Sequence, residues 1–243
     1  LGDIALAPDG SIFAYTGLNR NHIVKVDPEG IIHTYAGKDR TRGEPTGDGG
    51  PALEATLGNE INGLAMGADG SLYFTLTGAH YPAGYIRKID PNGIISTIAG
   101  VNYNHTANTS GDGGPASQAR LTAPIDLVVG PDGSIYFSER AGGVNNWKAR
   151  VRKIDPNGIV TTVVGGGDKA MTDPALENSG LPATSVNIGR AYGLAFGPDG
   201  AMYLAFPVEK VVLRLGADGL LTRFAGNGQD DTGVPNGPAT AMG

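Results

Sequence analysis

Apolar residues in this chain come in short runs separated by turn-forming residues, and the whole pattern occurs four times. Residues 123–166 contain every part of it: Ile-Asp-Leu-Val-Val, Ile-Tyr-Phe, Val-Arg-Lys-Ile and Ile-Val-Thr-Thr-Val-Val, divided by two tight turns and one longer loop. Short runs bounded by Gly, Pro and Asp are typical of β-strands. The repeat therefore predicts a unit of four antiparallel strands.

Two columns of turn residues align the four repeats. The first turn contains Asp9, Asp69, Asp132 and Asp199, each followed by Gly. The second turn reads Asp-Pro-x-Gly from Asp27, Asp90 and Asp155, and the fourth repeat keeps only its final residue, Gly219. Pro presets φ, Asp caps the local backbone and Gly accepts a positive φ. We therefore interpret these recurring Asp residues as turn caps.

The runs between the turns predict the strands. They are 4–7, 11–16, 22–26 and 31–36 in the first repeat, 64–67, 71–76, 85–89 and 94–99 in the second, 127–130, 134–138, 150–154 and 159–164 in the third, and 194–197, 201–206, 211–215 and 220–225 in the fourth. The first two strands of each repeat are apolar at consecutive positions, so both of their faces must be covered. Four-stranded units stacked face to face around an axis cover both faces, and this arrangement is a β-propeller.

The predicted fold class is thus all-β, a single propeller segment over residues 1–243 with four-stranded antiparallel blades at about 1–37, 61–100, 124–166 and 191–226. Connectors join the blades, and a trailing connector covers 227–243. Two connectors contain Gly-Asp-Gly-Gly-Pro-Ala, at 47–52 and 111–116, and the others keep only Pro-Ala. Pro at a first helical position predicts one helical turn after it. We expect Asp48 and Asp112 to cap backbone, because one carboxylate per loop is too few for calcium.

These motifs together resemble the NHL-repeat β-propeller family. Gly-Asp-Gly-Gly-Pro-Ala, Pro-Asp-Gly-Ser-Ile-Tyr-Phe, Arg-Lys-Ile-Asp-Pro-Asn-Gly-Ile and Thr-Ile-Ala-Gly carry the resemblance, which covers all four repeats and is similar to the long repeats of bacterial Rhs/YD-repeat and teneurin-like cell-surface proteins. The resemblance implies an extracellular or cell-surface location. Such rings commonly have about six blades, so we expect an arc of a larger ring, with a closed four-bladed or oligomer-completed ring as the alternative.

Charge and composition narrow the range of partners. The net charge is −6 without a block of like charge, which disfavours nucleic acid as a partner. No apolar run approaches the length of a membrane span, so no membrane insertion is expected. The absence of Cys excludes disulfides and thiolate metal ligands. A protein partner, a carbohydrate partner or other domains of the same parent chain remain.

The variable loops carry the candidate binding residues. Antiparallel order places the loops between second and third strands, together with the connectors, on one face, and rigid scaffolds commonly bind through such loops. The candidates on this face are His80, Tyr81, Tyr103, His105, Arg140, Asn145, Asn146 and Trp147. The loop 140–149 contains the only Trp and does not repeat elsewhere, so we expect function there first. The alternative is that each aromatic side chain folds back onto its own blade.

A second candidate lies near the propeller axis. Asp3, Asn62 and Asp126 enter or precede first strands and could hold Ca²⁺ through oxygen ligands, although such residues more often cap backbone. The four His residues lack zinc spacing and no G-x-S-x-G occurs, so no catalytic residue is assigned and no cofactor is expected. The sequence favours an interaction or structural module of a larger extracellular protein over its alternative, a lyase or hydrolase with a channel metal.

Overall fold

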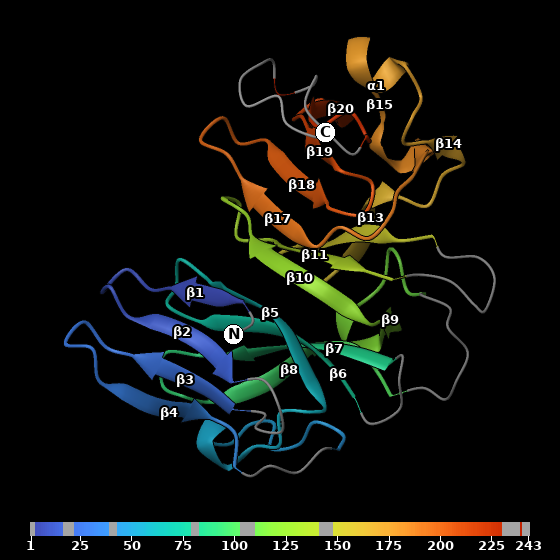
Figure 1. Ribbon diagram of the computed structural model, residues 1–243. Helices are drawn as coiled ribbons and strands as arrows, with labels where there is room; N and C mark the ends of the chain where they lie inside the picture. Colours follow the sequence, from blue (N-terminus) through green and yellow to red (C-terminus); the bar gives the residue numbers. More distant parts are fainter. Residues whose placement is uncertain are drawn as a thin grey trace.

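The computed structural model describes residues 3–16, 22–38, 43–78, 83–102, 110–140, 148–229 and 239. Four antiparallel four-stranded blades follow one another along the chain, with strands paired in chain order inside each blade (Figure 1). Blade 1 lies at one end of the arc and blade 4 at the other (Figure 1). The all-β propeller architecture predicted from the turn columns is confirmed.

The strand bounds agree with the sequence pattern to within a few residues. Blade 1 contains β1 (Ile4–Leu6), β2 (Ile12–Thr16), β3 (His22–Val26) and β4 (Ile32–Ala36); blade 2 contains β5 (Glu60–Met66), β6 (Leu72–Thr77), β7 (Ala83–Ile89) and β8 (Ile95–Ala99). Blade 3 contains β10 (Pro124–Val129), β11 (Ile135–Glu139), β12 (Arg150–Ile154) and β13 (Val160–Gly165); blade 4 contains β17 (Gly193–Phe196), β18 (Met202–Phe206), β19 (Val211–Leu215) and β20 (Leu220–Ala225).

The core lies between the blades. Successive first strands contact one another, so β1, β5, β10 and β17 line the inner side of the arc. Phe74, Phe137 and Leu204 are fully buried at equivalent positions of blades 2, 3 and 4. Blade 1 covers only one of its faces, because Leu6 is 67% exposed. Burial on both faces, as the consecutive apolar positions predicted, therefore holds inside the arc and fails at its first blade.

The connectors hydrogen-bond to the blades on both sides of them. The predicted helical turns are present as 3-10 helices, η1 (Ala52–Glu54) and η2 (Ala116–Gln118). The Ala52 carbonyl accepts from Gly37 N–H of blade 1 at 2.9 Å, and Ala52 N–H donates to Gly93 of blade 2 at 2.8 Å. Each connector thus fixes one blade to the next.

The third connector contains short elements that the sequence pattern did not predict. They are β14 (Lys169–Ala170), α1 (Ala175–Asn178), β15 (Leu181–Pro182), η3 (Ala183–Ser185) and β16 (Val186–Asn187). The pair β15 and β20 extends blade 4 to five strands. One further two-residue strand, β9 (Leu121–Thr122), pairs with β7 of the preceding blade.

A β-bulge recurs between the third and fourth strands of every blade. The register shifts directly before Val24, Arg87, Arg152 and Leu213, which are equivalent residues. A bulge increases local twist and turns a side chain in a new direction. In blades 2 and 3 the residue after the shift is a fully buried arginine.

Candidate functional site

Most of the predicted binding residues cannot be placed. His80, Tyr81, Tyr103, His105, Asn145, Asn146 and Trp147 lie outside the described residues. Arg140, the remaining candidate, is half-buried, and its N–H donates to the carbonyl of Thr122 at 3.0 Å. The described residues include the bases of the variable loops.

The bases of two predicted binding loops meet at Thr122 in β9. Thr122 pairs with Ala83, near the end of the loop 77–84, and its carbonyl accepts the hydrogen bond from the N–H of Arg140, which opens the loop 140–149. Gly84 next to this pair has no room for a side chain, because the ring of Pro124 packs against it. The next residue after β9, Ala123, has a positive φ of 41°. A non-glycine residue is uncommon in that region and is found more often at functional sites.

A third variable segment reaches the same place. The long connector that begins at Val101 returns to described structure at Ser110, whose N–H donates to the carbonyl of Arg120 at 3.4 Å. Arg120 directly precedes β9. The three predicted binding segments therefore have bases around residues 120–122, in blades 2 and 3.

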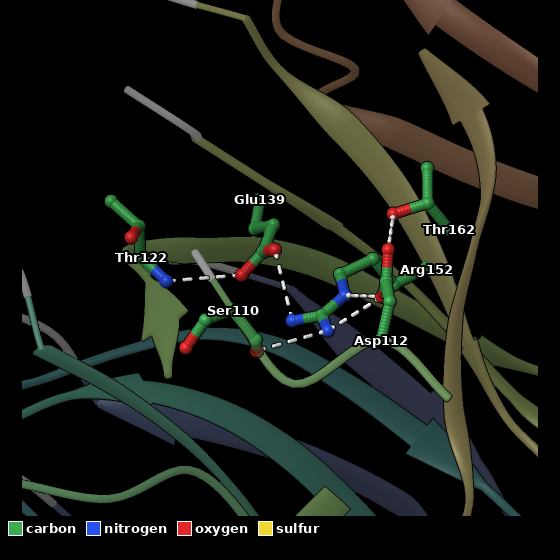
Figure 2. Close-up of polar contacts among 6 residues, drawn as sticks. All are labelled: Ser110, Asp112, Thr122, Glu139, Arg152 and Thr162. Carbon is green, nitrogen blue, oxygen red and sulfur yellow. Dashed lines mark hydrogen bonds and ion pairs between the residues drawn. The ribbon is translucent and has the colours of Figure 1, made fainter. Parts of the chain in front are cut away.

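A buried polar cluster, which we call the Arg152 anchor, lies beneath these bases and consists of Arg152, Asp112 and Glu139 (Figure 2). Arg152 Nη2 and Nε donate to Asp112 Oδ1 at 2.7 and 3.0 Å, and Nη1 lies 3.4 Å from Glu139 Oε1. Arg152 Nη2 also donates to the Ser110 carbonyl, and Glu139 Oε2 accepts from Thr122 N–H at 3.0 Å. The anchor thus contacts both the connector and β9.

Burial sets the charge state of the anchor. The side chains of Arg152 and Glu139 are 0% exposed, whereas that of Asp112 is 40% exposed. Burial raises the pKa of Glu139 to about 7, against the opposing effect of Arg152. Burial would also raise the pKa of Asp112, but the hydrogen bonds from Thr162 and Arg152 outweigh it and hold that pKa below its usual value. Asp112 is therefore the permanent counter-ion, and Glu139 titrates near neutral pH.

Blade 2 has a counterpart, the Arg87 anchor, formed by Arg87 and Asp48. Arg87 Nη2 donates to Asp48 Oδ1 at 2.6 Å and to the Thr46 carbonyl at 2.9 Å, and Nη1 donates to the Thr56 carbonyl at 2.9 Å. The expectation that the two connector aspartates cap local backbone was wrong: each binds an arginine of the following blade. The reason is that the connector runs along the outer strands of that blade, where the buried guanidinium needs a counter-charge.

Sequence reasoning also missed Glu139. Its equivalents are Leu76 in blade 2 and Phe206 in blade 4, both fully buried. A glutamate where blades 2 and 4 have Leu and Phe was the available signal, because buried carboxylates are rarely found without a partner.

The axial candidates bridge neighbouring blades. Asp3 Oδ2 accepts from Leu64 N–H at 2.7 Å, and Asp126 Oδ2 accepts from Leu194 N–H at 2.7 Å. Asn62 Nδ2 donates to the Pro124 carbonyl at 3.0 Å. Each side chain is thus engaged with the backbone of the next blade.

The structure brings no group of three or more Asp, Glu or His side chains together as metal ligands within the described ranges. Burial raises the pKa of Asp126 to about 6, although the hydrogen bonds from Leu194 and Leu127 oppose the rise. In the same part of the chain, no helix is long and apolar enough to cross a membrane.

The sequence matches a known family and known relatives. The family described as "Teneurin NHL domain" matches residues 105–230. Teneurin-3 of Mus musculus is 32% identical over 186 residues, which cover 74% of this chain and 6% of that protein. Teneurin-m of Drosophila melanogaster is 27% identical over 187 residues, again 74% of this chain and 6% of the relative. The chain therefore spans a small fraction of the length of the relatives that it matches.

Solved structures share the fold at low sequence identity. A putative gluconolactonase has a TM-score of 0.54 and 15% identity, with 91% of this chain and 61% of that chain covered. A catalytically inactive virginiamycin B lyase from Staphylococcus aureus has a TM-score of 0.51 and 18% identity, with 97% and 56% covered. At these identities the likeness concerns the fold alone.

Proposed function

Because the chain belongs to the teneurin NHL domain family, we propose that it is an interaction module of a larger cell-surface protein and binds a protein or carbohydrate partner through its variable-loop face. The finer part of the proposal concerns the loops 77–84 and 140–149 and the connector 101–110. His80, Tyr81, Tyr103, His105, Arg140, Asn145, Asn146 and Trp147 remain its candidate contact residues.

One observation supports this proposal most directly: the three segments have bases at one place, around β9. Thr122 contacts the base of one loop through Ala83 and the base of another through Arg140. Loops with a common rigid base can present their side chains to a single partner, and a preorganised surface loses less entropy on binding. Loops distributed separately around the blades would not have this property.

The Arg152 anchor adds rigidity under that face. Its arginine and Glu139 are fully buried and connect β9 to the connector. A buried charge network with its hydrogen bonds made holds the surrounding backbone in one arrangement. The anchor is therefore a supporting element of the proposed face, and its residues are not proposed as partner contacts.

The test is to measure binding with fluorescent tetramers of the chain, applied to an array of immobilised glycans and to a panel of cell lines. Replacing residues 141–147 of the loop 140–149 with a Gly-Ser turn should reduce binding at least about tenfold, since the central contacts carry most of an interface's energy. It should leave the unfolding temperature unchanged, because the bases of the loop at Arg140 and Ala149 are kept. Trp147→Ala should also reduce binding, by a smaller factor.

The matched control is Asn157→Ala on the opposite, turn-bearing face. Undiminished binding after the loop change, or loss of binding after the control change, would contradict the proposal. No binding in any assay would favour a module that only spaces other domains. The alternative enzyme with a channel metal predicts stoichiometric Ca²⁺ by elemental analysis and its loss in Asp126→Asn.

A further inference from the structure

The outer edge of blade 1 is open, although the same edge is covered in the other blades. Ile32 in β4 is 63% exposed, whereas its equivalents Ile95, Val160 and Leu221 are 0% exposed. Ile31 beside it is 57% exposed. An edge strand with unpaired backbone and apolar side chains is ready to pair with another segment. No described residue hydrogen-bonds to the outer side of β4.

The other blades show what covers this edge. In blade 2, Gly49 N–H donates to the Ile95 carbonyl at 2.8 Å and Ile95 N–H donates to Gly50 at 3.0 Å. In blade 3, Val160 makes the same two bonds with Gly113 and Gly114, at 2.8 and 3.0 Å. In each case the covering segment is the connector that leads into the blade.

Blade 4 is covered in the same way by a different kind of connector. Leu181 of β15 pairs with Leu221, and Ala183 N–H donates to the Gly219 carbonyl at 3.1 Å. This connector has Ser179 where the other two have Asp48 and Asp112, four residues before the Ala that recurs in each connector. The edge is therefore closed by extended backbone that ends in Pro-Ala, whether or not the connector has an Asp at the position of Asp48.

The residue that follows the bulge in the third strand differs between blades with an Asp-containing connector motif and blades without it. The two connectors with Asp precede the two blades with a buried arginine in that strand, Arg87 and Arg152. The connector that has Ser179 in place of this Asp precedes blade 4, which has Leu213 at that position. Blade 1 has Val24 there. A carboxylate placed against Val24 would lose hydration without gaining a cation, which is unfavourable.

We propose that β4 of blade 1 is the docking edge for a Pro-Ala connector that carries no carboxylate at the position of Asp48, contributed by a neighbouring NHL repeat of the same parent chain. The proposal rests on the proposed function to the extent that it assumes a larger parent protein. It concerns a different face and needs no external partner, so the two can fail independently.

The experiment places each kind of connector before blade 1 of the full chain. One fusion puts a copy of residues 173–192 directly before Asp3, since Gly193 is the equivalent of Asp3. The other puts a copy of residues 43–62 there, since Gly63 is also equivalent. The first should slow amide exchange of Ile32 N–H at least about tenfold relative to the unfused chain, because a new hydrogen bond protects the amide. The second should slow it less.

The Val24→Arg variant should reverse this order, because the fusion with Asp48 then supplies the counter-charge. The matched control replaces the copy of Asp48 in the fused connector with Ser and leaves the native Asp48 unchanged. It should remove the reversal. Protection by neither fusion, with folding verified by circular dichroism, would overturn the proposal. If the two fusions protected Ile32 N–H equally, both with Val24 and with Val24→Arg, then residue 24 would not select the kind of connector. Protection that grows with concentration in the unfused chain would instead identify a second copy as the occupant.

Discussion

Arg87 and Arg152 occupy the same position in consecutive blades, and both side chains are 0% exposed, yet their partners differ. Arg87 binds one half-exposed carboxylate, Asp48, and two backbone carbonyls. Arg152 binds Asp112 and one carbonyl and also lies beside Glu139, which is fully buried. Blade 2 has an apolar residue, Leu76, in place of Glu139.

Because of this difference, the Arg87 anchor has a structural role alone, whereas the Arg152 anchor also contains a group that titrates near neutral pH. The Arg87 anchor keeps its charge balance at any pH at which Asp48 is ionised, because burial raises the pKa of Asp48 but the hydrogen bonds from Arg87 and Thr97 outweigh it. The Arg152 anchor contains a second acid with a pKa of about 7, directly under the bases of the variable loops. Of the two anchors, the Arg152 anchor alone therefore places an acid with a pKa near neutral pH under the proposed binding face.

The largest predicted effect follows from removing the two arginines. Arg152→Leu leaves Glu139 buried without its cation and should cost about 3–5 kcal/mol of unfolding free energy at pH 8. Arg87→Leu leaves only a half-exposed Asp48 and two carbonyls, and should cost about 1–3 kcal/mol. Leucine fits this position, because Leu213 occupies it in blade 4. Urea unfolding measures both values.

The double variant Arg152→Leu with Glu139→Leu tests the cause, because it gives blade 3 the pair of apolar residues that blade 4 has as Leu213 and Phe206. It should recover at least about half of the loss, as expected for two residues in direct contact. Equal losses in the single and double variants would show that the buried carboxyl is not the source.

A smaller effect concerns pH. The pKa of Glu139 is raised in the folded chain from an ordinary value of 4.5 to about 7. Between these values the folded state keeps a proton that the unfolded state has released, so stability falls as the pH rises through this window. The slope contributed by this group is at most about 1.4 kcal/mol per pH unit. Urea unfolding of the parent and of Glu139→Gln from pH 5 to pH 8 measures the difference.

The comparison must be made as a difference between the two proteins. Asp126, with a pKa of about 6, contributes a slope of the same sign, and it is present in both. Leu76→Gln in blade 2 is the matched control, because it places the same amide above Arg87 without removing an acid. Parallel stability profiles for the parent and Glu139→Gln would contradict the assignment.

The blades could be predicted from the sequence because each turn has a chemical requirement. Gly10, Gly70, Gly133 and Gly200 all have φ between 75° and 86°, as their turn column demands. The same local rule led to the wrong interpretation of Asp48 and Asp112, because their partners lie in a different blade. A signal was present: Gly-Asp-Gly-Gly connectors precede only those blades that carry the buried arginine. Recognising this signal requires that the connector position of Asp48 be compared with the third-strand position of Arg87 across all the repeats.

The common base of the loops was not predictable in the same way. β9 consists of Leu121 and Thr122 alone, which is too short for an alternation of apolar and polar residues to be seen. Its partner in β7 belongs to the preceding blade, so no local pattern connects them. The variable loops could be identified as exceptions to the repeat, but where their bases meet depends on how consecutive blades pack.

The smallest predicted effect concerns the threonines that support the two aspartates from the fourth strands. Thr162 Oγ1 donates to Asp112 Oδ2 at 2.6 Å, and Thr97 Oγ1 donates to Asp48 Oδ1 at 3.2 Å, an oxygen that Arg87 already uses. Thr162→Val should therefore cost about 1 kcal/mol and Thr97→Val about half of that, since a partly exposed hydrogen bond contributes modestly. Urea midpoints at pH 7 resolve the two.

Blade 1 supplies the control for this last comparison. Thr34 is the equivalent residue, it is exposed, and its side chain makes no hydrogen bond to any residue that the structure describes. Thr34→Val should leave the urea midpoint unchanged. If all three substitutions lowered it equally, the cost would come from replacing a hydroxyl in any fourth strand, and the aspartates would not depend on these threonines. A graded series, with Thr162 largest and Thr34 zero, would instead show that these threonine hydroxyls contribute to stability only where a connector aspartate accepts their hydrogen bond.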